Sequence, residues 1–168
     1  MTTDSVSAPA REFRQVAYEH PDVARLVEEL QGFFVATYGE PDQTPVEPAE
    51  FSSPDGAFFV VYEAGDPVAM GGWRRLEPGT DGVPGEQPVE VKRMYVVDGQ
   101  RGRGHARAVL AHLEAHAAAA GADWAVLVTG SPQTAAVSLY HSTGYEDVGR
   151  YSVYAGEPDA VHLGKRLR

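Results

Sequence analysis

Apolar residues recur with the spacing of a helix in three stretches of the chain. The first begins at Pro21, the second runs from Ala106 to Ala120, and the third ends near Gly144. In each, apolar side chains return every three or four positions and so share one helical face. These positions are Val23, Leu26, Val27, Leu30 and Phe33 or Phe34 in the first; Ala106, Val109, Leu110, Leu113, Ala117 and Ala120 in the second; Ala135, Ala136, Leu139 and Tyr140 in the third. Proline is favoured in a first turn and glycine after a last one, so we predict three helices.

Between the helices, runs of apolar, β-branched and aromatic residues predict strands. We expect them at residues 12–18, 57–63, 67–75, 89–96, 124–129, 145–150 and 161–167. Ala64-Gly65-Asp66 has the turn chemistry of a hairpin. The run Trp124–Thr129 is continuously apolar, as in parallel strands that are buried on both faces. Together with the strand and helix before it, this run predicts a β-α-β unit with a right-handed crossover.

The order of these elements predicts a mixed α/β fold with helices on both faces of one mixed sheet. A chain of 168 residues has the length of one domain, which we place at 11–168, after a small, polar and disordered tail at 1–10. Two segments lack apolar periodicity. Thr37–Pro54 is rich in proline and acid and forms a short helix or a loop, whereas Leu76–Pro88 is a Gly/Pro loop.

The turn Gln100–Ala106 joins a strand to the second helix and carries the most specific chemistry of the chain. The first turn of a helix has free backbone N–H groups and the positive end of the helix dipole, which together favour an anion. Glycines let the backbone approach that anion, and arginines add fork-shaped donors. They are Gly102 and Gly104, and Arg101, Arg103 and Arg107. The P-loop and dinucleotide fingerprints are both absent, so the turn predicts a pyrophosphate site of another kind.

Several motifs in order resemble the GNAT superfamily of N-acetyltransferases. Arg101-x-x-Gly104-x-Ala106 is similar to the family signature [QR]-x-x-G-x-[GA], and the strand 89–96 precedes it at the family's spacing. Downstream, Gln133-x-x-Ala136-x-x-Leu139-Tyr140-x-x-x-Gly144-Tyr145 resembles the family's second motif. Leu127-Val128-Thr129-Gly130 resembles its L-E-T-G stretch, with Val128 where many relatives carry Glu. The similarity covers roughly residues 11–168.

The resemblance implies a mostly antiparallel central sheet in which two parallel strands splay apart. It implies acetyl-CoA as co-substrate, with no metal, and a pantetheine arm inserted between the splayed strands. Backbone groups of Met94, Tyr95 and Val96 would pair with this arm like an added strand, and Gln133 would reach the coenzyme. The pyrophosphate would be bound by Arg101, Gly102, Arg103, Gly104, His105, Ala106 and Arg107.

Glu90 is the candidate general base. An alkyl amine has a reference pKa of about 10.4 and must lose a proton before it attacks a thioester. Relatives that use a strand glutamate for this purpose carry it at the spacing that Glu90 has from the turn, and it would act directly or through a water. Strict alternation would place Glu90, Lys92, Met94 and Val96 on one face of the strand. The alternative is that Glu90 pairs with Lys92 or an arginine at an exposed strand start.

Tyr140 is the candidate general acid. It matches the tyrosine of the family's second motif, where a phenol would protonate the leaving thiolate of the coenzyme. The oxyanion donor would be a backbone N–H near Tyr95. The alternative for Tyr140 is a core aromatic, because Ala136, Leu139 and Tyr140 share a helix face.

Net charge and missing residue types narrow the partners. The formal net charge of −10 argues against a nucleic-acid binder, since phosphate contacts dominate such affinity. It suits a cationic acceptor amine, although general solubility is the simpler explanation. The absence of cysteine excludes disulfides and a cysteine nucleophile. His112 and His116 lack the H-E-x-x-H pattern, so we assign them to a solvated face and expect no metal.

Location and assembly follow from weaker signals. We expect a cytoplasmic protein without membrane contact, because no apolar run is long enough to span a bilayer and the N-terminus does not resemble a signal peptide. The excess of arginine over lysine and the abundant alanine suggest a GC-rich bacterial genome. Relatives are often dimers, so a homodimer through the C-terminal strands is compatible with the resemblance.

The acceptor itself stays open. Thr37–Pro54 and Leu76–Pro88 would line its site, and an antibiotic, a polyamine, an amino acid or a protein N-terminus all fit. Glu90 and Tyr140 together favour an N-acetyltransferase over a non-catalytic acyl-CoA-binding regulatory module on the same fold. The order of the motifs argues against a nucleotide-phosphate binder unrelated to acyl transfer.

Overall fold

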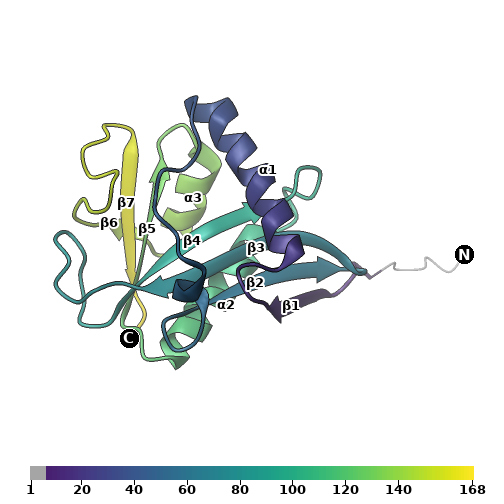
Figure 1. Ribbon diagram of the computed structural model, residues 1–168, viewed down its shortest axis with the longest axis horizontal. Coiled ribbons are helices and arrows are strands. Elements are labelled where there is room, and N and C mark those ends of the chain that lie inside the picture. Colours follow the sequence, from purple (N-terminus) through teal and green to yellow (C-terminus); the bar gives the residue numbers. More distant parts are fainter. Residues whose placement is uncertain (1–6) are drawn as a thin grey trace, which may run out of the picture.

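A seven-stranded mixed sheet runs through the computed structural model, which describes residues 7–168 (Figure 1). Its strand order is β1-β2-β3-β4-β5-β7-β6. The strands are β1 (Arg11–Gln15), β2 (Gly56–Glu63), β3 (Asp66–Arg75), β4 (Pro88–Val96), β5 (Trp124–Gly130), β6 (Glu146–Asp147) and β7 (Ala160–Arg166). Of the tail expected at 1–10, residues 1–6 lie outside the described range, and residues 7–10 are exposed and form no helix or strand.

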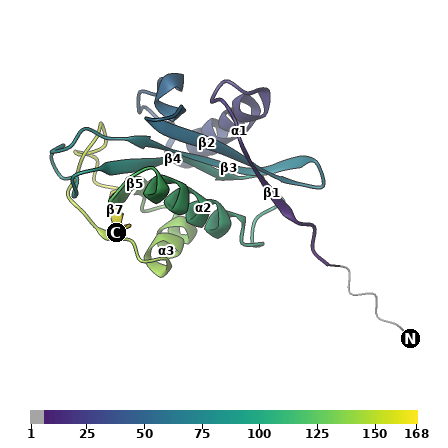
Figure 2. The same cartoon turned by 90° about the horizontal axis from the view of Figure 1, so that it is seen from below.

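Helices cover both faces of this sheet, as expected (Figure 2). On one face lie α1 (Pro21–Tyr38) and the short 3₁₀ helix η1 (Pro48–Phe51); on the other lie α2 (His105–Ala119) and α3 (Thr134–Ser142). Each face has its own apolar core. The α1-side core is centred on Val23, Leu26, Leu30, Phe51, Phe58 and Met70, and the α2-side core on Trp73, Val109, Leu110, Leu113, Leu127 and Leu163.

The three helices confirm the predictions from apolar spacing. Pro21 stands in the first turn of α1, and Gly39 ends the helix in a left-handed conformation with φ of 84°. Helix α2 lies close to the sheet because Gly71 has no side chain. A Cβ there would lie 2.9 Å from Cγ1 of Val109. Within residues 7–168, no helix has the length and apolar character of a membrane crossing.

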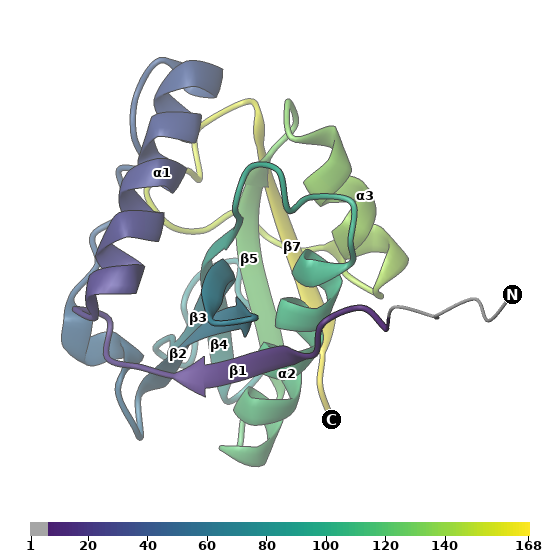
Figure 3. The same ribbon diagram turned by 90° about the vertical axis from the view of Figure 1, so that its right-hand side faces the viewer.

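The parallel strands β4 and β5 splay apart, as the resemblance implied. They pair only at Pro88–Trp124, Val89–Ala125 and Glu90–Val126, after which both strands continue without each other. Figure 1 shows the two strands diverging from this shared start, and Figure 3 shows α1 and α3 on opposite sides of β5. The divergence leaves backbone groups of both strands free of their usual partner, which is a place where an extended ligand can bind.

A β-bulge in β4 makes the expected strict alternation wrong. Tyr95 pairs with Met70 but Lys92 pairs with Gly72, so β4 holds an extra residue, and Arg93 has a positive φ of 58°. Lys92 and Arg93 both reach Asp42 on the α1 face, whereas Met94 and Val96 pack into the α2-side core. Glu90 and Lys92 therefore do not share a face with Met94 and Val96.

Two further expectations need correction. The histidines of α2 do not lie on a solvated face. The ring of His112 stacks on Phe13 with centroids 4.3 Å apart, and Trp73 Nε1 donates to His116 Nδ1 at 3.1 Å. The expected strand at 145–150 is only the two residues Glu146–Asp147, because the chain then leaves the sheet to pack against the loop of Gly82.

Candidate active site

The turn before α2 has the backbone of an anion site. Gly102 and Gly104 have φ of 76° and 81°, a left-handed conformation that glycine adopts readily, and Gly104 is the N-cap of α2. Over residues 7–168, no backbone carbonyl accepts a hydrogen bond from any N–H of residues 101–107. The space beside Gly102 is open, since a Cβ there would meet no atom within 4 Å. These donors are therefore available to a phosphate at the positive end of the helix.

The three arginines of the turn lie in three different directions. Arg101 lies over the ring of Phe33, with 5.5 Å to its centroid. Arg107 donates to Ser142 Oγ on α3 at 3.0 Å. Arg103 pairs with Glu63 at 3.2 Å. Arg103 is therefore already neutralised by the protein, whereas no carboxylate of the described residues pairs with Arg101 or Arg107.

His105 and the β4 residues complete the predicted coenzyme set. The ring of His105 is buried and faces Arg11 and Glu63, so this residue offers the turn its backbone N–H rather than its side chain. Met94, Tyr95 and Val96 lie on the splayed part of β4. The structure thus brings Met94–Val96 and the turn to one edge of the splay.

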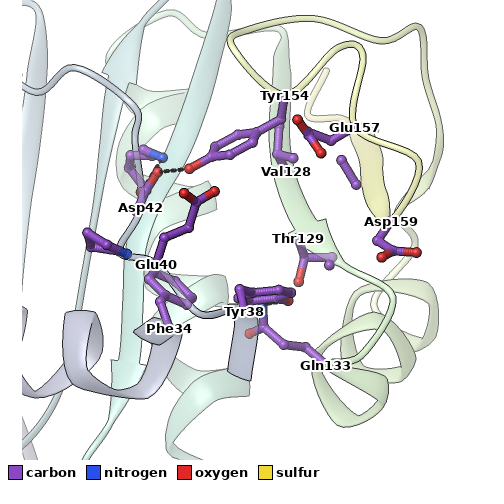
Figure 4. Close-up of a pocket in the computed structure, with 14 residues that line it drawn as sticks. Phe34, Tyr38, Glu40, Asp42, Val128, Thr129, Gln133, Tyr154, Glu157 and Asp159 are labelled. Carbon is purple, nitrogen blue, oxygen red and sulfur yellow. Dashed lines mark hydrogen bonds and ion pairs between the residues drawn. The ribbon is translucent and has the colours of Figure 1, made fainter. Parts of the chain in front are cut away.

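A pocket of about 270 Å³ opens on the α1 side of the splay (Figure 4). It is built by the end of α1, the segment after it, β4, β5, the start of α3 and the loop before β7. The lining residues are Phe34, Tyr38, Glu40, Pro41, Asp42, Lys92, Val128, Thr129, Gly130, Gln133, Tyr154, Glu157, Asp159 and Ala160. Tyr38, Glu40, Pro41 and Asp42 of the segment Thr37–Pro54 contribute to this pocket. Leu76–Pro88 does not line this pocket; Asp123 binds its end through the N–H groups of Glu86 and Gln87.

A buried ionic network forms one wall of the pocket. Asp42 pairs with Lys92 at 2.9 Å and with Arg93 at 2.6 Å, and accepts a hydrogen bond from the Tyr154 hydroxyl at 2.6 Å. Burial acts to raise the pKa of Asp42, but Lys92, Tyr154, the N–H of Thr44 and Arg93 together hold it well below its usual range. Burial lowers the pKa of Lys92, although the negative charge of Asp42 opposes this shift. Burial and the hydrogen bond to Asp42 raise the pKa of Tyr154 to about 12. The network connects the segment that follows α1 to β4 and to the loop before β7.

The pocket also holds carboxylates that are not neutralised. Among the described residues, the side chains of Glu40, Glu157 and Asp159 form no ion pair or hydrogen bond, and all three residues are exposed. Figure 4 shows them around the cavity, Glu40 on one side and Glu157 and Asp159 on the other. Because Asp42 is balanced by Lys92 and Arg93, these three carboxylates dominate the charge at the rim.

Gln133 and Tyr38 close one end of the pocket. Gln133 Nε2 donates to the Tyr38 hydroxyl at 2.7 Å, which links the start of α3 to the end of α1. Tyr38 also lies against Gly130, where a Cβ would come within 2.0 Å of its hydroxyl. The predicted coenzyme residue Gln133 thus lies at the junction of the splay and the pocket.

Glu90 is buried in an ion pair and does not line the pocket. Its Oε1 accepts from Arg74 Nη2 at 2.9 Å, and Arg74 also binds Glu50 at 2.7 Å. The strand start is buried, so the alternative of an exposed pair with Lys92 is wrong, and the arginine partner comes from the neighbouring strand β3. Burial and then the charge of Glu90 raise the pKa of nearby Tyr151 well above its usual value.

Tyr140 lies on the opposite face of the sheet from Glu90, in the α2-side core. Its residue is 8% exposed, and its hydroxyl lies 3.9 Å from the sulfur of Met94 on the splayed part of β4. Burial raises the pKa of Tyr140 to about 12, so the phenol keeps its proton at neutral pH. Tyr140 is therefore a core aromatic, as the alternative held, and its hydroxyl faces Met94 on the splayed strand, so its role as general acid stays a prediction.

Three residues that shape the pocket were not among the predicted site residues. Tyr38, Thr129 and Tyr154 come from a helix end, a strand end and a loop; Thr129 belongs to the L-V-T-G stretch, but neither tyrosine lies in a quoted motif. The signal for Tyr154 was its position as an aromatic residue in the acidic loop 150–160, because an aromatic side chain in a polar loop often packs against another part of the protein.

Comparison with known proteins identifies related chains. The family described as "Acetyltransferase (GNAT) family" matches residues 23–145. An "IAA acetyltransferase" from Azospirillum brasilense is 30% identical over 145 residues, which is 86% of this chain and 90% of that protein. An acetyltransferase of the GNAT family from Staphylococcus aureus MU50 superposes with a TM-score of 0.70 at 16% identity, over 94% of this chain and 100% of that one. The PaiA N-acetyltransferase from Thermoplasma acidophilum, solved in complex with coenzyme A, gives 0.66 at 13% identity, over 94% and 99%. These two structures share the fold.

Proposed function

Because this chain belongs to the GNAT family of acetyltransferases, we propose that it transfers an acetyl group from acetyl-CoA to a primary amine of a small molecule or peptide by direct attack. One observation carries the proposal. The anion-binding turn and the acidic pocket lie at the same splay between β4 and β5, one on each side. A ligand that is anionic at one end and reactive at the other would join them.

The residues of the turn and the splay fit coenzyme A. The free N–H groups of residues 101–107 and the unpaired Arg101 and Arg107 suit its pyrophosphate. The backbone of Met94–Val96 suits its amide-containing arm, and Gln133 would bind this arm near the reactive end. Coenzyme A supplies the thioester, and these residues orient it.

The pocket suits a cationic acceptor. The three carboxylates that have no partner among residues 7–168 would attract a positively charged amine and raise its local concentration. The rings of Phe34, Tyr38 and Tyr154 offer apolar walls to the rest of the molecule. We therefore expect alkyl amines with an apolar or second cationic part to be better acceptors than amines that carry a carboxylate.

Glu90 and Tyr140 would handle the protons from opposite faces of the sheet. The amine enters from the α1 face, where Glu90 would accept its proton through a water, since Glu90 does not line the pocket. The nitrogen then forms a bond to the thioester carbon as the carbon–sulfur bond breaks, and the nitrogen releases its second proton to solvent, from which the Tyr140 phenolate regains one after the thiolate is protonated. Tyr140, whose hydroxyl faces the splay from the α2 face, would give its proton to the sulfur. Removal of the amine proton and protonation of the thiolate are thus separated in space.

Thermal unfolding with and without acetyl-CoA, followed by an amine panel, tests the proposal. A ligand that binds only the folded protein must raise the midpoint, so we expect a clear shift and release of free thiol with cationic amines. Glu90→Gln and Tyr140→Phe should slow turnover without removing the shift. No shift at saturating acetyl-CoA would contradict the coenzyme site. A shift without transfer to any amine would instead favour a non-catalytic acyl-CoA-binding module.

A further inference from the structure

Four polar side chains meet behind the coenzyme-binding turn, on the side away from the pocket. Arg11 comes from the edge strand β1, Glu63 from the end of β2, Arg103 from the turn and His105 from the first position of α2. Figure 3 shows β1 running beside the start of α2. The side chain of His105 is fully buried and that of Glu63 is 9% exposed.

Arg11 holds the residues on both sides of Gly104. Its Nη2 donates to the backbone carbonyl of Arg103 at 2.5 Å, and its Nε donates to Nδ1 of His105 at 3.0 Å. Its guanidinium also lies against Gly104 itself, where a Cβ would stand 3.3 Å from Nη2. One side chain from β1 therefore fixes the orientation of the peptide groups whose N–H groups form the anion site.

Glu63 holds the same turn from a second direction. It pairs with Arg103 at 3.2 Å, and its Oε1 lies 3.5 Å from Nε2 of His105. Arg103 is thereby kept at the back of the turn instead of in its mouth. The turn is thus held from behind by an edge strand and a hairpin end, and neither Arg11 nor Glu63 lines the pocket on the α1 side of the splay.

The hydrogen bond from Arg11 requires a neutral His105. An arginine Nε–H can only donate, so Nδ1 of His105 must accept and carry no proton, which places the ring proton on Nε2 toward Glu63. A second ring proton would sit on Nδ1 and face the Arg11 donor. The charged groups around the ring in the described structure are Arg11, Glu63 and Arg103. Burial, opposed by Glu63 and assisted by both arginines, lowers the pKa of His105, so the ring is neutral at physiological pH.

We infer that Arg11 and His105 are positioning residues for coenzyme binding, and that protonation of His105 releases the turn and weakens the binding of acetyl-CoA. This inference rests on the proposed coenzyme site. Because Arg11 and His105 act on the turn and not on the acceptor, their loss should change the KM for acetyl-CoA and leave kcat at saturating coenzyme unchanged.

Calorimetric titration with acetyl-CoA at pH 8 tests the role of Arg11. Arg11→Met keeps the length of the side chain but removes its donors, and should weaken binding about tenfold, as expected for lost hydrogen bonds from a charged group. Arg14→Met is the matched control, because Arg14 lies on the same strand but pairs with its exposed neighbour Glu12 and lies over the ring of Tyr62, and among the described residues it forms no hydrogen bond or ion pair with the turn. Equal affinity of Arg11→Met and Arg14→Met, with wild type binding normally, would overturn the inference and leave the coenzyme site intact. Absence of binding by wild type would overturn both.

The pH dependence tests His105 separately. The phosphates of the coenzyme also titrate near pH 6, so the acetyl-CoA affinity of wild type is compared with that of His105→Asn at each pH. The side-chain oxygen of this asparagine can still accept a hydrogen bond from Arg11, but the side chain does not take up a proton in this pH range. As the pH falls from 8 toward 5.5, wild type should lose severalfold more affinity than His105→Asn. Parallel curves of acetyl-CoA affinity against pH for the two proteins would overturn the role of His105. Thermal unfolding without ligand over the same pH range checks that both proteins stay folded.

Discussion

The two halves of the proposed active site are built in different ways. The proposed coenzyme turn is one continuous segment, residues 101–107, and the groups it offers a ligand are mainly backbone N–H donors. The acceptor pocket draws its lining from α1, two loops, β4, β5 and the start of α3, and its chemistry is in side chains. Backbone donors at a helix start depend on glycine and helix geometry, whereas the pocket can change its partners by substitution of exposed residues. We therefore expect the turn to bind a ligand that does not vary, and the pocket to bind an acceptor that can vary.

The most severe test of this contrast is a carboxylate placed in the turn. Gly104→Glu puts a negative charge and a side chain at a position with φ of 81°, where the pyrophosphate would lie, so we expect acetyl-CoA affinity to fall by more than about a hundredfold. The measurement is the acetyl-CoA-dependent shift in the unfolding midpoint. Gly121→Glu is the control, because it has a similar φ of 101° in open space at the other end of α2. An equal shift in both variants would contradict the anion site.

The ionic wall of the pocket should matter more for stability than for coenzyme binding. Asp42→Asn leaves Lys92 and Arg93 buried without their carboxylate, which costs on the order of 3 kcal/mol in the free energy of unfolding. Denaturant unfolding measures this loss, with the exposed Asp81→Asn as control.

The same pair of variants gives a pH signature. The pKa of Asp42 is lower in the folded protein than in the unfolded chain, so its stabilisation is complete above about pH 4 and is lost as the pH falls below that value. The difference in unfolding free energy between wild type and Asp42→Asn should therefore be constant from pH 5 to 7 and shrink toward pH 3. A difference that grows as the pH falls would show that the network does not hold Asp42 ionised.

Between the two halves lies the phenol of Tyr140. Tyr140→Phe keeps the core ring and removes only the hydroxyl that faces the splay, so kcat should fall on the order of a hundredfold with little change in acetyl-CoA affinity. Tyr145→Phe is the matched control, since Tyr145 is also buried and its ring centroid lies 5.7 Å from that of Tyr140. Steady-state kinetics of both variants decide the point, and an equal loss of kcat would assign the effect to packing.

Local pattern predicted the elements and the turn, while long-range contacts decided the rest. Helix spacing, the Ala64–Asp66 hairpin and the glycines of the turn depend on neighbours in sequence, and the structure confirms them. The bulge in β4 did not show in the sequence, because the residues around Arg93 alternate well and only pairing with β3 shows the extra residue. Arg74, which binds Glu90, lies on the neighbouring strand β3, sixteen positions away in sequence.

The acceptor pocket shows the same limit more strongly. Asp42 was visible as one acid in a proline-rich segment, but its partners lie 50, 51 and 112 positions further along the chain. No local sequence feature distinguishes Asp42 from Glu40 or Glu47, which are both exposed in the structure. A carboxylate that stabilises the fold and one that faces a substrate therefore look alike until the chain is folded.

The smallest expected effects come from the rim, and they test whether the pocket selects by charge. Glu157→Gln with Asp159→Asn removes two unpaired carboxylates without breaking a described contact, so we expect the KM of a dicationic amine to rise about three- to tenfold while kcat and acetyl-CoA affinity stay unchanged. Glu77→Gln, on the loop that does not line the pocket, is the control. Because exposed charges are screened by salt, the difference between wild type and the double variant should shrink as ionic strength rises from 0.01 to about 0.5 M. The KM could instead rise equally for neutral and dicationic amines, or the rise could persist at high salt. Either result would mean that the rim acts by shape and that the pocket does not select its acceptor by charge.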